Sequence, residues 1–151
     1  MIYQFKYNQK TYLCKPFSRF MENFIQIYRL DITQFDIITP IPLFSSRFRE
    51  RGYNQSQLLA EQIAWKYHID LSLKNLIRIR NTAHQTFLTE KERWTNIRGA
   101  FRIVNSAEFS GKNILIIDDL LTTGATVSDA AGVLKDAGAQ TVGVLVLAAT
   151  V

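Results

Sequence analysis

The residue types best suited to chemistry lie together at positions 118–126, which read DDLLTTGAT. The threonine hydroxyls can donate hydrogen bonds to a phosphate, and the glycine lets the backbone approach a ligand closely. Two adjacent carboxylates would repel that phosphate unless they bind something else, and carboxylates bind sugar hydroxyls or a hydrated Mg²⁺. A ribose 5-phosphate would satisfy both groups of residues, with its diol at Asp118 and Asp119 and its phosphate at the threonines and Gly124.

A strand and a helix should flank this segment. The unbroken apolar run of 114–117 predicts a strand over 113–118 that is buried on both faces, as in a parallel sheet. Apolar side chains then share one face of a predicted helix that Gly138 ends: Val127, Ala130, Ala131, Leu134 and Ala137. With an apolar strand at 142–147, the pattern predicts a right-handed βαβ unit. Such sheets bind ligands at the carboxyl ends of their strands, where helix N-termini attract anions.

The remaining elements complete an α/β fold, and residues 1–14 fit either a strand or a helix. Apolar spacing predicts helices that begin at Pro16, include Leu59 to Tyr67, and cover Glu90 to Asn96 with Thr89 as cap. Short strands are predicted at 35–39, 76–80 and 101–104, and residues 43–53 are predicted to form an arginine-rich loop.

Composition and charge limit the possible classes of protein. The 151 residues predict a single domain, and 47% apolar residues exclude a disordered chain. The sequence has no signal peptide and no apolar stretch that could span a membrane, and Cys14 is the single cysteine, so we expect a cytoplasmic protein. The net charge is +5, and residues 47–102 hold 11 Lys and Arg against 5 Asp and Glu. This excess indicates either a solvated basic face or a surface that binds phosphates.

The segment 114–126 resembles the phosphoribosyl pyrophosphate (PRPP) motif of type I phosphoribosyltransferases, an apolar strand, two acidic residues and a loop ending in T-G-x-T. The alternative is an Asp-rich turn before a Thr-capped helix. A Walker loop is excluded because no lysine follows Gly124. A receiver domain is excluded because its Asp pair opens the fold, whereas only 33 residues follow Asp118 here.

Further motifs are similar to those of the ComF family, phosphoribosyltransferase-like proteins linked to natural competence and DNA uptake in bacteria. They are PIPL at 40–43, RFRERGYNQ at 47–55, RNTAHQTFL at 80–88 and RWTNIRGAF at 93–101. Two features depart from the family. The four-cysteine zinc module that many members carry at the N-terminus is absent, so we expect no zinc, and His84 stands where the family often has proline.

The resemblance implies roles for three groups of residues. The carboxylates Asp118 and Asp119 are the expected catalytic residues, and no residue is assigned as a metal ligand. The residues expected to bind the ribose 5-phosphate of PRPP are Asp118, Asp119, Leu121, Thr122, Thr123, Gly124, Ala125 and Thr126. The expected pyrophosphate loop contributes Arg47, Arg51 and Gly52, and the expected flexible loop contributes Arg80, Gln85, Arg93 and Asn96. For any single arginine, the alternative is a solvated surface residue.

The resemblance also implies a fold and a reaction. The fold is an open, mainly parallel sheet flanked by helices, with residues 1–30 as a small N-terminal hood and 31–151 as the core. The reaction is displacement at C1′ of PRPP, with Mg²⁺ and release of pyrophosphate, to an acceptor that the sequence does not identify. The alternative is a non-catalytic module that binds single-stranded DNA or serves as an adaptor for a DNA-translocating ATPase. A homodimer is left open.

Overall fold

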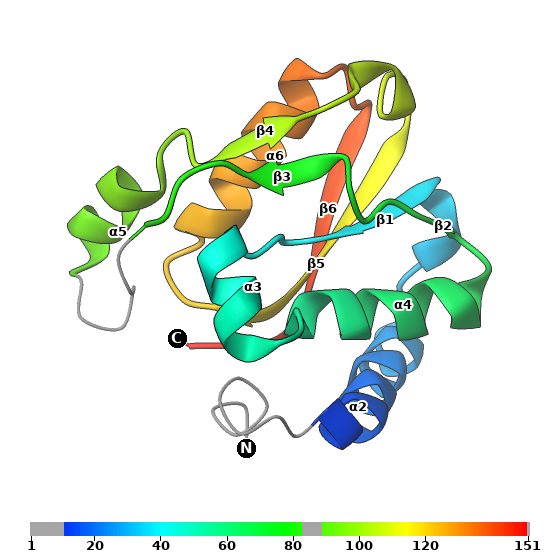
Figure 1. Ribbon diagram of the computed structural model, residues 1–151. Coiled ribbons are helices and arrows are strands. Elements are labelled where there is room, and N and C mark those ends of the chain that lie inside the picture. The colour runs from blue at the N-terminus through cyan, green and yellow to red at the C-terminus, as the bar shows by residue number, and fades with distance from the viewer. Residues whose placement is uncertain (1–10, 83–88, 151) are drawn as a thin grey trace.

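A four-stranded parallel sheet lies at the centre of the computed structural model, which describes residues 11–82 and 89–150. Its strand order is β2-β1-β5-β6 (Figure 1). The strands are β1 (Ile37–Pro40), β2 (Asp70–Leu71), β5 (Asn113–Leu121) and β6 (Thr141–Ala149), and every neighbouring pair is parallel. The predicted open, mainly parallel sheet is therefore confirmed.

Helices and a hairpin cover the two faces of this sheet. On one face lie α2 (Cys14–Ile27) and α4 (Gln55–Tyr67). On the other lie α6 (Ala125–Asp136) and an antiparallel hairpin of β3 (Leu76–Arg78) and β4 (Phe101–Ile103). The two remaining helices of the described chain are α3 (Ser45–Arg51) and α5 (Glu90–Ile97). Three 3₁₀ turns complete it: η1 (Thr11–Leu13), η2 (Ile32–Gln34) and η4 (Ser106–Glu108). No helix in the described ranges is long and apolar enough to cross a membrane.

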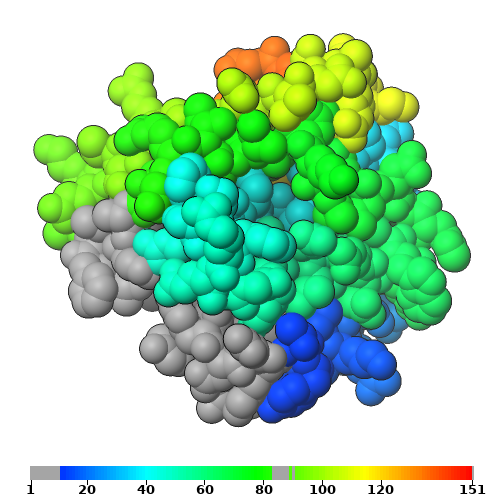
Figure 2. Space-filling model, viewed as in Figure 1, coloured from blue at the N-terminus to red at the C-terminus, as the bar shows by residue number. Residues whose placement is uncertain are grey.

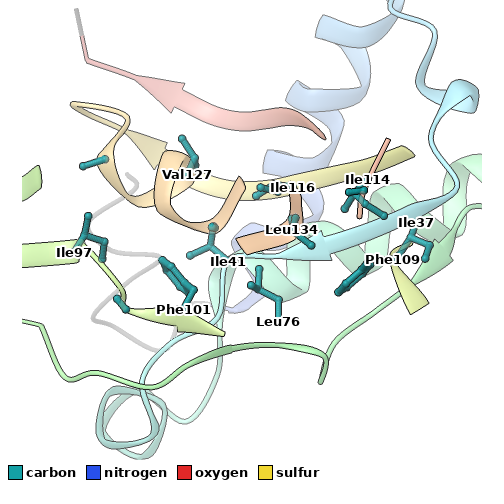
Figure 3. Close-up of a cluster of buried hydrophobic side chains, with 14 residues drawn as sticks. Ile37, Ile41, Leu76, Ile97, Phe101, Phe109, Ile114, Ile116, Val127 and Leu134 are labelled. Carbon is teal, nitrogen blue, oxygen red and sulfur yellow. The ribbon is translucent and has the colours of Figure 1, made fainter. Parts of the chain in front are cut away.

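The central strand β5 explains why two hydrophobic clusters form. Successive side chains of a strand point to opposite faces. Leu115 and Ile117 therefore pack with α2 and α4, while Ile114 and Ile116 pack with α6 and the hairpin. Figure 3 shows the second cluster, in which Ile114 and Ile116 lie with side chains from α6 and the hairpin. The predicted burial of this strand on both faces is confirmed.

The prediction of a loop over residues 43–53 is wrong in part. Residues 45–51 form α3, because SSRFRER contains good helix formers and neither glycine nor proline. Gly52 ends the helix in the left-handed conformation at φ 79°, and its N–H donates to the carbonyl of Phe48. The arginines of this segment are therefore held on a helix rather than on an irregular loop.

Two strand predictions also change. The strand predicted to end at Asp118 continues to Leu121, because β6 pairs with it as far as Ala149. The strand predicted over 76–80 ends at Arg78 and belongs to the separate hairpin. The prediction of a hood over residues 1–30 falls partly on residues outside the described ranges. Within them, α2 packs against α4 and the sheet, and the hood stays a prediction.

Candidate functional site

The segment 118–126 surrounds one small pocket where β5 meets α6. Asp118 lines it together with Leu121, Thr122, Gly124, Ala125 and Thr126. Gly124 adopts the left-handed conformation at φ 79°, which turns the chain so that α6 begins at Ala125. The Thr123 hydroxyl accepts a hydrogen bond from the N–H of Ala125 at 3.4 Å. The first-turn N–H groups of α6 and nearby threonines thus frame a small pocket that attracts an anion, which we call the phosphate pocket after the group that the sequence leads us to expect there.

Asp118 is fixed from two directions. Both it and Asp119 are buried, with 8% and 5% of their surface exposed. The Oδ1 atom of Asp118 accepts hydrogen bonds from the Ser56 hydroxyl at 2.8 Å and from the backbone N–H of Asp119 at 2.9 Å. Carboxylate oxygens are acceptors, the type of atom that binds a sugar hydroxyl.

The position of Ser56 depends on the cap of α4. The side chain of Asn54 accepts from the N–H of Ser56 at 3.1 Å and donates to the carbonyl of Ile41 at 2.9 Å. These two bonds tie the start of α4 to the end of β1 and direct the Ser56 hydroxyl to Asp118. Asn54 is therefore the N-cap of α4, and the sequence analysis did not single out Ser56.

Three guanidinium groups lie close to one another, and Arg78 among them also lies close to Asp118. Arg47 and Arg51 lie on α3, and Arg78 lies at the end of β3, which α3 adjoins (Figures 1 and 2). Burial lowers the pKa of Arg78 and the charges of Arg47 and Arg51 lower it further, while the nearby Asp118 raises it. The Arg78 side chain also donates to the hydroxyl of Thr82 and lies 5.6 Å from the ring centroid of Phe101.

The sequence analysis chose Arg80 and missed Arg78. In a strand, alternate residues share a face, so Arg78 lies on the same side as the buried Leu76. An arginine on the buried side of a predicted strand was the signal that could have identified it. Arg80 is exposed, and its Nη1 donates to the carbonyl of Arg98, before β4.

The remaining residues of the predicted flexible loop lie partly on α5. Arg93 and Asn96 are half-buried on this helix, whereas Gln85 lies outside the described residues. Thr89 caps α5 as predicted and forms a capping box with Glu92. The structure thus brings Asp118 and the start of α6 together around one pocket, and the arginines of α3 close to Arg78.

Comparison with known proteins identifies the family. A family model described as "Phosphoribosyl transferase domain" matches residues 52–150. The chain is 32% identical over 152 residues to the DNA utilization protein YhgH of Escherichia coli K12 and 29% identical to Competence protein F of Haemophilus influenzae. These alignments cover 99% and 98% of the chain and 66% of each relative. The chain belongs to the ComF family.

Another ComF relative is Competence protein ComFC of Bacillus subtilis, which is 36% identical over 136 residues, covering 89% of this chain and 52% of that protein. Solved structures show the type I phosphoribosyltransferase fold. The glutamine PRPP amidotransferase of B. subtilis matches with a TM-score of 0.57 at 20% identity, over 89% of this chain and 26% of that one. A hypoxanthine phosphoribosyltransferase of Staphylococcus aureus matches with a TM-score of 0.51 at 13% identity, over 88% and 62%.

The carboxylates of this ComF domain fit Mg²⁺ only if a substrate helps to hold the ion. Within the described residues, no three His, Cys, Asp or Glu side chains gather closely enough to hold a metal. Asp118 and Asp119 supply two carboxylates beside the phosphate pocket. Mg²⁺ in proteins is commonly held by one or two carboxylates together with substrate phosphates and water.

Proposed function

We propose that this ComF domain binds PRPP together with Mg²⁺ and transfers its phosphoribosyl group with release of pyrophosphate. One observation supports this most directly. A buried carboxylate, Asp118, lines the phosphate pocket at the start of α6 and lies close to the guanidinium group of Arg78, which Arg47 and Arg51 approach in turn. Carboxylate, phosphate pocket and cations correspond to the three chemical parts of PRPP: its sugar hydroxyls, its 5-phosphate and its pyrophosphate.

In this arrangement the protein positions groups and stabilises charge. The loop 122–126 holds the 5-phosphate, and Asp118 and Asp119 accept hydrogen bonds from the ribose hydroxyls. The acceptor forms a bond to C1′ as the bond from C1′ to the pyrophosphate oxygen breaks, and the electron pair leaves with pyrophosphate. Guanidinium groups donate to that leaving group and stabilise its charge. Bound Mg²⁺ would supply further positive charge to the pyrophosphate.

A link to DNA uptake is part of the proposal. It is supported by relatives named as DNA utilization and competence proteins. The chain spans 66% of the length of the first of these relatives, so their whole-protein partners are proposals for this chain. A DNA-translocating ATPase and a homodimeric state remain proposals based on the family alone.

Thermal unfolding tests PRPP binding. PRPP with Mg²⁺ at millimolar concentration should raise the melting temperature, because a ligand that binds only the folded state stabilises it. The double variant Asp118→Asn/Asp119→Asn should lose this shift, while Asp70→Asn, an exposed carboxylate on β2, should keep it. Absence of a shift in the parent protein would rule out PRPP binding. Release of pyrophosphate with candidate acceptors then tests turnover.

A second candidate function is the binding of single-stranded DNA without catalysis. The net charge of residues 47–102 and the exposed Trp65 and Trp94, with 76% and 44% of their surface exposed, favour it. Phosphate contacts make such binding fall steeply with salt, and aromatic rings stack on bases. Binding of a labelled oligonucleotide at low and high salt tests this candidate, and no binding at low salt would exclude it.

A further inference from the structure

A groove between α5 and α6 lies beside the site described above. Its volume is about 480 Å³, within the range of small-molecule pockets. The α5 wall carries Trp94, Ile97 and Arg98, and the α6 wall carries Ser128, Asp129 and Gly132. Ala125 lines both this groove and the phosphate pocket. The groove therefore adjoins the phosphate pocket through the first residue of α6.

Gly132 keeps the α6 wall open. A glycine destabilises the interior of a helix relative to alanine, so the presence of Gly132 inside α6 needs an explanation. A Cβ atom built on Gly132 would meet no atom within 4 Å, and its backbone does not have the positive φ that favours glycine. Neither close packing nor backbone geometry requires glycine here. Its missing side chain leaves space in the groove that Trp94 also lines.

The side chains that line the groove suit a flat ring that carries an amino group. The Trp94 side chain has 44% of its surface exposed and offers an aromatic face for stacking. Asp129 is held in place because its two oxygens accept from the N–H groups of Gly99 at 2.9 Å and Ala100 at 3.1 Å. Each carboxylate oxygen can accept a further hydrogen bond, and Asp136 adds a second carboxylate to the groove.

We propose that the groove between α5 and α6 binds a nucleobase, with its ring stacked on Trp94 and its exocyclic amino group donating to Asp129 or Asp136. Adenine and cytosine carry such an amino group, whereas thymine does not. The base comes either from a free nucleoside or from a single-stranded nucleic acid. This site is distinct from the ribose-binding carboxylates, and it does not depend on the proposed reaction with PRPP.

Tryptophan fluorescence tests the proposal. Trp65 and Trp94 are the two tryptophans, so the variant Trp65→Phe leaves Trp94 as the reporter, and Trp65 is exposed enough to be replaced. Adenosine and cytidine should quench this fluorescence to saturation, and thymidine should bind at least about fivefold more weakly. A short oligodeoxyadenylate is titrated in parallel with the nucleosides. Whichever of the two kinds of ligand binds more tightly identifies the source of the base.

Two variants in the same background show whether the groove is the site. Gly132→Leu should fill the groove and weaken quenching at least about tenfold, because base stacking contributes strongly to such binding. Lys135→Leu adds the same side chain at an exposed position of α6 that does not line the groove, and it should leave binding unchanged. Unfolding temperatures measured alongside verify that both variants are folded.

Two results would overturn the proposal: no saturable quenching by any probe at millimolar concentration, or quenching that Gly132→Leu leaves intact. Failure of the PRPP proposal has a different signature. The double variant Asp118→Asn/Asp119→Asn should bind adenosine as the parent does. Loss of PRPP stabilisation with adenosine binding retained therefore separates the two sites.

Discussion

The hydroxyl of Ser56 donates a 2.8 Å hydrogen bond to Oδ1 of Asp118, 62 positions later in the chain. Both side chains are buried, with 4% and 8% of their surface exposed. This bond joins the first turn of α4 to the end of the central strand, at the edge of the phosphate pocket. It fixes the orientation of the carboxylate that we propose receives the ribose hydroxyls.

Replacing Ser56 tests this relationship. Ser56→Ala leaves a buried carboxylate oxygen with one donor fewer, which should cost about 1–3 kcal/mol of unfolding free energy. It should also reduce the thermal shift produced by PRPP and Mg²⁺, because Asp118 loses its fixed orientation. Ser18→Ala is the control, since Ser18 is equally buried but donates within its own helix. A full PRPP shift in Ser56→Ala would show that the bond does not serve ligand binding.

Removing the charge of Arg78 should weaken the binding of pyrophosphate. Arg78→Gln takes away the guanidinium group that lies close to Asp118, and a hydrogen bond to a charged group contributes about 1.5–3 kcal/mol. Isothermal titration with pyrophosphate and Mg²⁺ should therefore show an affinity at least about tenfold lower. Arg102→Gln is the matched control and should keep the parent affinity, because Arg102 is on the same hairpin but exposed. Equal affinities in both variants would remove Arg78 from the anion site.

Two glycine-to-alanine changes should have opposite effects on stability. A Cβ on Gly143 would lie 2.4 Å from Cζ of Phe35, so Gly143→Ala should lower the unfolding free energy by about 1–3 kcal/mol. Gly132→Ala meets no atom within 4 Å and should raise it by about 0.4–1 kcal/mol. Urea unfolding of both variants measures the difference. If Gly143→Ala proved as stable as the parent, the ring of Phe35 would have to move without cost.

The thiol of Cys14 should be unreactive in the folded protein. Burial, and then the charge of Glu61, raise the pKa of Cys14 from 9.0 to about 11. Since the thiolate is the reacting form, a disulfide reagent at pH 8 should modify Cys14 slowly in buffer and rapidly in denaturant. A raised pKa in the folded state also means that stability is unaffected below pH 9 and falls as the pH rises toward 11. Cys14→Ala should show a smaller fall, and rapid labelling in buffer would contradict the burial.

The capping box of α5 should weaken in acid. Hydrogen bonds from the side chain and backbone of Thr89 lower the pKa of Glu92 below 4.5. Because the folded pKa is lowered, the stabilisation is present above pH 4.5 and is lost as the pH falls through the lower folded value. Hydrogen exchange of the α5 amides, corrected for intrinsic rates, should show protection lost in that range. Glu92→Gln should remove this pH dependence, and unchanged protection at pH 3 would contradict the prediction.

Much of the fold was predictable because its signals are local. The apolar run of 114–117 predicted a strand buried on both faces, and Thr89 and Gly138 marked helix ends. Helix α3 was missed although its signal is local, whereas the other errors lie where tertiary pairing decides. The strand that seemed to end at Asp118 extends to Leu121 because β6 pairs with it, which the residues of β5 alone do not specify.

The sequence by itself predicted the strand, turn and helix start around residues 118–126, because these residues are contiguous and the pattern is local. Only the tertiary structure decided which groups surround Asp118. Ser56 and Arg78 come from other elements, and parallel crossovers and the hairpin bring them to the same end of the sheet. The groove between α5 and α6 arises in the same way. Such relationships depend on packing between distant segments, and no local spacing in the sequence encodes them.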